Sequence, residues 1–117
     1  MGTFATTSKN AMLGALTVTY LSLHSADPGV AGLVAELSGG SPAYARKPAT
    51  FNAAASGERL LASDVTFDVP AGTVLYVGYW SAIAGTFIGS DIVTSETFGA
   101  QGQYIVKATT SKLALTD

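Results

Sequence analysis

The fold of this 117-residue chain depends most on the stretch Thr73-Val-Leu-Tyr-Val-Gly-Tyr-Trp-Ser-Ala-Ile-Ala-Gly-Thr-Phe-Ile-Gly89, which holds the only tryptophan, Trp80. If the stretch is extended, alternate side chains point to opposite sides. One side then carries Val74, Tyr76, Gly78, Trp80 and Ala82, and the other carries Leu75, Val77, Tyr79 and Ile83. Both sides are mostly apolar, which predicts a central strand covered on both faces. Ala84-Gly85 then predicts a reversal, and Thr86-Phe87-Ile88 a return strand.

The rest of the chain also favours short strands separated by turns. Residues 18–24 and 65–69 alternate between apolar and polar side chains, and turn residues such as Asp27-Pro28-Gly29 lie between such runs. Residues 43–51 are expected to form an edge segment. Pro48 has no N–H to donate to a neighbouring strand, and the charges of Arg46 and Lys47 guard the edge against pairing with a further strand. Further short strands are expected around 92–93, 104–109 and 112–116. The pattern predicts a mostly β, antiparallel sandwich or jelly-roll-like domain, with core candidates Leu21, Leu23, Phe67, Val77 and Trp80.

The N-terminal segment is the best helix candidate. Apolar side chains recur at helical spacing from Phe4 to about Leu16, and Thr3 can cap the start. Gly14 weakens the helix, so it needs a surface to lie on. It either closes the open end of the sandwich or docks onto a neighbouring subunit. We therefore expect a single domain over 1–117, with a helix at about 4–16 and a β-sandwich over 18–117.

The composition limits the possible partners. Charged residues make up 12% of the chain, about half of the usual share of roughly 25%. Such a chain is either secreted or largely covered by other subunits, and the covered surface is the favoured expectation. No apolar run is long enough for membrane insertion. The net charge is −2 and the basic residues are scattered, which argues against nucleic-acid binding. The chain has no cysteine, and no basic residue precedes Lys9, so neither disulfides nor a signal peptide are expected.

The sequence offers few residues for catalysis or metal binding. His24 is the only histidine, and its neighbours Ser25 and Asp27 would point away from it on a strand end. We expect His24 to bond the turn at Asp27 rather than to take part in a catalytic triad. It also lacks the His or Cys companion of a metal site.

The acidic and glycine residues give no stronger signal. Asp64 and Asp68 would lie roughly 13 Å apart along a strand and are expected to be solvated. Asp91 and Glu96 are a weak calcium candidate, and no glycine-rich phosphate loop is present. No catalytic residue, cofactor or metal is therefore predicted. A sugar-stacking surface is an alternative to core packing for the aromatic residues Tyr20, Tyr44, Tyr76, Tyr79, Tyr104 and Trp80.

Four short motifs carry a resemblance to a known family. In order, they are Leu21-Ser-Leu-His-Ser-Ala-Asp-Pro-Gly29, Glu36-Leu-Ser-Gly-Gly-Ser-Pro-Ala-Tyr-Ala-Arg46, Val65-Thr-Phe67 and Val77-Gly-Tyr-Trp-Ser-Ala82. Together with the N-terminal helix, they resemble a family of small tailed-bacteriophage and prophage proteins often labelled "phage tail fibre protein". The resemblance covers most of the chain. It implies a non-enzymatic structural protein of the virion, assembled in the bacterial cytoplasm.

Two locations on the virion are compatible with this resemblance. One small β-domain leaves no room for a fibre shaft, so the leading expectation is a capsid decoration protein that stabilises the shell. The alternative is a tail fibre or minor tail protein that contacts the host surface, and a phage hydrolase is a disfavoured third. The expected partners are copies of the chain in a small symmetric oligomer, with a trimer favoured, and virion proteins such as the major capsid protein. Candidate contact residues are Phe4, Met12, Leu16, Arg46, Lys47 and Pro48.

Overall fold

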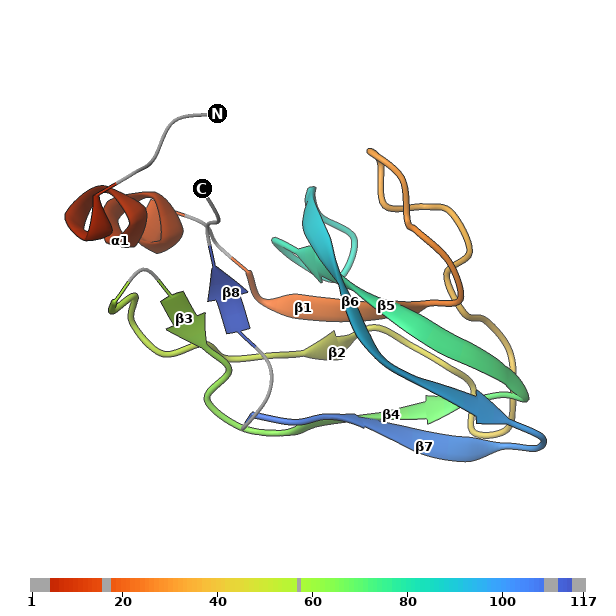
Figure 1. Ribbon diagram of the computed structural model, residues 1–117. Coiled ribbons are helices and arrows are strands. Elements are labelled where there is room, and N and C mark those ends of the chain that lie inside the picture. The colour runs from red at the N-terminus through yellow and green to blue at the C-terminus, as the bar shows by residue number, and fades with distance from the viewer. Residues whose placement is uncertain (1–4, 16–17, 57, 109–111, 115–117) are drawn as a thin grey trace.

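The structure is a computed structural model that describes residues 5–15, 18–56, 58–108 and 112–114. It is mostly antiparallel β with one short N-terminal helix (Figure 1), as the sequence predicts. In order, the elements are α1 (Thr6–Ala15), β1 (Tyr20–His24), β2 (Lys47–Pro48), β3 (Glu58–Leu60), β4 (Val65–Val69), β5 (Gly72–Trp80), β6 (Phe87–Phe98), β7 (Gly102–Val106) and β8 (Lys112–Ala114).

The largest sheet has the strand order β2-β1-β5-β6. Strand β5 pairs with β1 on one side and with β6 on the other, and both pairs are antiparallel. Leu21 lies opposite Tyr79, and Leu23 lies opposite Val77. The stretch predicted to be central therefore does form an interior strand of the sheet.

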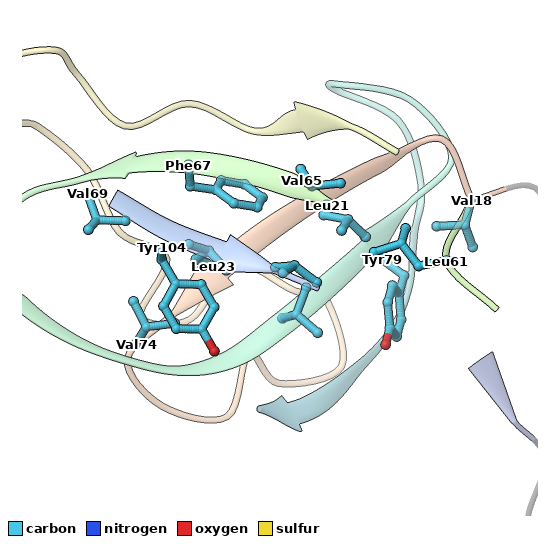
Figure 2. Close-up of a cluster of buried hydrophobic side chains, with 12 residues drawn as sticks. Val18, Leu21, Leu23, Leu61, Val65, Phe67, Val69, Val74, Tyr79 and Tyr104 are labelled. Carbon is cyan, nitrogen blue, oxygen red and sulfur yellow. The ribbon is translucent and has the colours of Figure 1, made fainter. Parts of the chain in front are cut away.

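A second layer consists of the antiparallel pair β4–β7, in which Phe67 lies opposite Tyr104. Alternate residues of β4, namely Val65, Phe67 and Val69, are buried while Thr66 is exposed. Their side chains meet those of Leu21 and Leu23 in one cluster, shown in Figure 2. The two layers thus enclose the core between them, as expected of a sandwich.

The central strand departs from the simple alternation expected of it. Val74, Val77 and Tyr79 all belong to the core cluster, although Val74 and Val77 are an odd number of positions apart. A register shift between Val74 and Tyr76 accounts for this, because a bulge changes which side the following residues face. The prediction that Val74 shares a side with Tyr76, Gly78 and Trp80 was therefore wrong.

Strand β6 is longer than predicted. The return strand at 86–88 and the separate strand around 92–93 are parts of one strand, Phe87–Phe98. Its register against β5 shifts at two places, between Val74 and Tyr76 and between Tyr79 and Trp80. Gly89 and Asp91 lie within this strand, opposite Tyr79 and Val77 of β5.

Helix α1 lies against β3 at one end of the molecule (Figure 1). The structure places the helix at Thr6–Ala15, within the predicted range of about 4–16. Met12 is partly exposed on it, whereas Phe4 and Leu16 lie outside the described residues. Within the described ranges, no helix is long and apolar enough to cross a membrane.

Candidate functional site

A buried polar cluster lies on the face of the large sheet that points away from the core. Ser22 and His24 of β1 are completely buried there, and Ser22 lies opposite Gly78 of β5. Trp80, at the end of β5, joins the same face through a hydrogen bond to Ser22. We call Ser22, His24, Glu36, Tyr44, Arg46, Gly78 and Trp80 the Trp80 cluster.

Three hydrogen bonds run through the cluster in one direction. Trp80 Nε1 donates to Ser22 Oγ at 2.8 Å, and Ser22 Oγ lies 2.7 Å from His24 Nε2. His24 Nδ1 lies 2.8 Å from the carbonyl oxygen of Val34. A carbonyl oxygen only accepts, so Nδ1 carries the hydrogen and Nε2 of the neutral ring accepts from Ser22. Burial favours this neutral form and lowers the pKa of His24, against the opposing effects of the Val34 carbonyl and Glu36.

Gly78 makes room for these three polar groups. A Cβ at this position would overlap Ser22 Oγ and would lie 3.0 Å from His24 Nε2 and 3.3 Å from Trp80 Nε1. The glycine is therefore required for space, because a side chain would displace the atoms of the hydrogen-bonded chain.

Arg46 covers the cluster and ties three segments together. Its guanidinium carbon lies 3.6 Å from the centroid of the Trp80 ring, a cation–π contact. Nε and Nη2 donate to the two carboxylate oxygens of Glu36 at 2.9 and 2.8 Å, and Nη1 donates to the Ile83 carbonyl at 2.8 Å. This bidentate geometry is the strong form of an arginine–carboxylate pair. It raises the pKa of Arg46 above its ordinary value.

Glu36 and Tyr44 link the cluster to the core. The Tyr44 hydroxyl donates to Glu36 Oε2 at 2.8 Å and accepts from the backbone N–H of Leu23 at 2.9 Å. Its ring is stacked against that of Phe67 in the core, with 6.2 Å between centroids. Burial opposes the ionisation of Glu36, but the bonds from Arg46 and Tyr44 outweigh it and hold the pKa of Glu36 below its usual range. Burial also raises the pKa of Tyr44.

The geometry is unsuited to nucleophilic catalysis. Ser22 Oγ is buried and already accepts from Trp80, and the partner of His24 Nδ1 is a carbonyl rather than a carboxylate. In the part of the chain that the structure describes, no group of three or more histidine, cysteine or acidic residues is placed to hold a metal ion. The same part leaves no buried side-chain nitrogen or oxygen without a hydrogen-bond partner. These features are typical of a structural network.

Two predictions about the cluster residues were wrong. His24 does not bond the turn at Asp27; its ring points to Ser22 and Val34, while Asp27 Oδ1 accepts from the N–H of Gly29. Arg46 was expected to guard the sheet edge, but its side chain folds back onto Trp80 and Glu36. Lys47 and Pro48 do form the edge strand β2.

The remaining candidates fall in different places. The structure buries Leu21, Leu23, Phe67 and Val77 in the core cluster; Trp80 is also buried, but within the Trp80 cluster on the opposite face. Tyr79 donates to Asp91, and Tyr104 donates to the Thr94 carbonyl. All six aromatic side chains proposed as a sugar-stacking surface are buried or half-buried, so they form no exposed platform. Asp64 accepts from the Ala108 N–H, and Asp68 lies 3.4 Å from Gln103.

Sequence reasoning missed Glu36, Tyr44 and Gly78 as members of a cluster. One signal was available: Ser22 and His24 alternate onto the same side of a strand, and that side therefore carries two polar groups that need partners. Their partners come from residues 34–46 and from β5, and only the tertiary structure brings these segments together.

Exposed apolar side chains gather near the cluster on two loops and on β6. Val30, Leu33 and Val34 precede Glu36, and each is more than half exposed. Ile83 follows β5, and Ile92 lies opposite Tyr76 on β6, both also more than half exposed. The Trp80 cluster therefore supports a surface that includes several large apolar groups.

Comparison with known proteins identifies the family. A family model described as "Podophage GP4 fiber I protein gp80" matches residues 4–116. No curated protein matches the chain. The match extends from the N-terminal helix to the last strand and includes every member of the Trp80 cluster. The chain therefore belongs to this family of fibre-type structural proteins of bacteriophage virions.

Proposed function

We propose that the protein is a non-enzymatic component of the tail appendages of a podophage-type virion. The observation that carries this proposal is the family match over residues 4–116, because the model is named for a fibre protein. The same match favours the tail over the capsid shell, which reverses the order of preference drawn from the sequence. A domain measuring 45 × 26 × 24 Å can serve as one module of an appendage built from several chains.

The structure offers two surfaces for attachment to other subunits. Met12 is partly exposed on α1, and β2 is the edge strand of the large sheet, with Pro48 exposed and β4 beside it. We propose that these surfaces, with Lys47 and Pro48 at the edge, contact neighbouring virion proteins. A small symmetric oligomer, with a trimer favoured, would repeat such contacts around an axis.

The loops next to the Trp80 cluster suit contact with an external surface. Arg46 joins the segment that carries Glu36 to the loop that carries Ile83, which restricts the motion of both. Preorganised loops lose less entropy on binding. We propose that this end of the domain, with Val30, Leu33 and Ile83, points away from the particle.

Labelling of intact virions tests the location. Virions that carry an epitope tag on this protein are incubated with gold-conjugated antibody and imaged by electron microscopy. The proposal predicts gold at the tail. Gold spread evenly over the head would instead establish a decoration protein, and purified particles from which the protein is absent by immunoblot would contradict both locations.

A further inference from the structure

His24 is the only histidine of the chain and its ring is completely buried. We propose that His24 and its hydrogen bonds form an acid-sensitive latch. The neutral ring holds residues 25–35 against the outer face of β1 and β5, and protonation releases this segment while the sandwich stays folded. The proposal concerns a conformational change and holds for either location on the virion.

The hydrogen-bond directions explain why the latch needs a neutral ring. Nδ1 donates to the Val34 carbonyl, so Nε2 must accept from the Ser22 hydroxyl. Protonation would place a second N–H on Nε2, facing that hydroxyl. The Ser22 hydrogen would then lose its acceptor, while the Ser22 oxygen already accepts from Trp80. The second lone pair of Ser22 Oγ can accept from the protonated Nε2, but the Ser22 hydrogen is left without an acceptor, so protonation costs one buried hydrogen bond.

The charges around the ring do not compensate a buried imidazolium. Glu36 favours the protonated form, but its carboxylate is already bonded by Arg46 and Tyr44. Arg46 repels a second positive charge. Tyr76 lies opposite His24 on β5, and Ser22 Oγ lies 2.7 Å from Nε2. A charged ring must therefore reach water, which requires the covering segment to move.

The covering segment, residues 25–35, includes two buried residues, Pro28 and Gly32. The bond from His24 to Val34 joins the segment to β1, and the bond from Ser25 N to Ala35 O closes the segment on itself. The residues that follow stay anchored, because Arg46 and Tyr44 hold Glu36 and the N–H of Leu37 donates to the Leu23 carbonyl. Ala35 has a positive φ of 57°, which is strained for a residue with a Cβ. The core lies between the sheet and β4–β7, on the other face (Figure 2). Release of the segment can therefore leave the core packing intact.

Release would change the surface of the molecule in two ways. Val30, Leu33 and Val34 are exposed on the segment and would move with it. Gly32 of the same segment packs against Phe87, whose ring contacts Trp80 at 5.2 Å between centroids. Release of the segment would therefore bring water to the Trp80 ring.

The single histidine and single tryptophan make the latch directly measurable. The wild-type chain is titrated from about pH 8 to about pH 5, a range in which histidine is the side chain that ordinarily titrates. NMR of the imidazole carbons follows His24, and fluorescence follows Trp80. Amide hydrogen exchange of Phe67 and Tyr104 follows the core.

We expect His24 to titrate below its ordinary value of 6.5, with a red shift of Trp80 emission at the same midpoint and continued protection of the core amides. Titration of His24 without a change in Trp80 emission would overturn the latch. Loss of core protection at the same midpoint would also overturn it, because His24 would then affect global unfolding and not one segment.

Two variants separate His24 from the neighbouring carboxylate. His24→Gln removes the titrating group, so the emission change between about pH 7 and about pH 5 should disappear. Glu36→Gln keeps His24 but removes a charge that favours its protonation, so the change should persist with a lower midpoint. An unaltered transition in His24→Gln would contradict the proposal. If His24→Gln does not fold, the wild-type titration decides. Equal midpoints for His24 protonation and for Trp80 emission support the latch, and different midpoints contradict it.

Discussion

At the scale of single residues, the space left by Gly78 determines whether the Trp80 cluster can form. Three polar atoms from Ser22, His24 and Trp80 converge where a Cβ would stand. Glycine is needed at position 78 for space, since a Cβ would clash with these atoms. The backbone conformation does not require it, because the φ of Gly78 is not positive. A methyl group at this position should therefore act through the hydrogen bonds alone.

Gly78→Ala should lower the free energy of unfolding by about 1–3 kcal/mol, the range for overpacking a closely packed site. The measurement is urea denaturation followed by Trp80 fluorescence. Gly89→Ala on β6 is the matched control, because a Cβ there would meet no atom within 4 Å. Equal stability of the two variants would show that Gly78 is not needed for space.

Trp80→Ala should cost about 3–5 kcal/mol, as for other large buried aromatic residues. The loss includes the contacts with Arg46 and Phe87 and the donor to Ser22. Trp80→Phe keeps an aromatic ring but removes the donor, so its cost should be smaller. Thermal melting followed by circular dichroism checks both values, and a wild-type melting temperature for Trp80→Ala would remove Trp80 from the interior.

The Glu36–Arg46 pair should make stability depend on acidity. The pKa of Glu36 is lower in the folded chain than its ordinary value of 4.5, so its contribution is complete above that value and is lost as the pH falls through the folded pKa. At neutral pH, Glu36→Gln should cost about 1–3 kcal/mol, as for hydrogen bonds to charged groups. The difference between variant and wild type should shrink on acidification in denaturant titrations; a constant difference would contradict the assignment.

At the scale of elements, the two layers depend on side chains that alternate along their strands. Phe67 of β4 is fully buried, and its ring is stacked against that of Tyr44. Phe67→Ala should cost about 3–5 kcal/mol through the cavity it leaves. Thr66→Ala, at the neighbouring exposed position, is the control and should change stability little. Calorimetric melting that gave similar values for both would place Phe67 outside the core.

Helix α1 should matter for assembly more than for stability. Met12→Asp should leave the β-domain folded but prevent incorporation into particles, because Met12 is partly exposed on the helix proposed to contact a neighbour. The control is Thr7→Asp, which adds the same charge to the same helix but five positions away, on a different side of the helix. Immunoblots of purified virions measure incorporation. Normal incorporation of Met12→Asp would show that this part of α1 is not the contact.

The alternation of side chains predicts the main strands because each strand has one buried face. Leu21, Leu23 and Phe67 follow this period, and their positions could be predicted from it. The bulge near Tyr76 could not be predicted, because it depends on the register between β5 and β6. Arg46 was misassigned for a similar reason: its partners Glu36 and Trp80 are distant in sequence.

At the scale of the whole molecule, membership of the fibre family covers both layers and the helix. The chain forms a small two-layered β-domain in which Arg46 joins the Glu36 segment to the Ile83 loop, and β2 is the edge strand of the large sheet, next to β4. We propose that this domain is one module of a tail appendage. Its location on the particle is the central claim of the proposed function.

The number of copies per virion tests this claim most directly. Purified particles are digested, and peptides of this protein are quantified by mass spectrometry against peptides of the major capsid protein. A tail appendage predicts a small number of copies, far below that of the capsid protein. A copy number comparable to that of the capsid protein would contradict the tail assignment and establish a protein that decorates the shell.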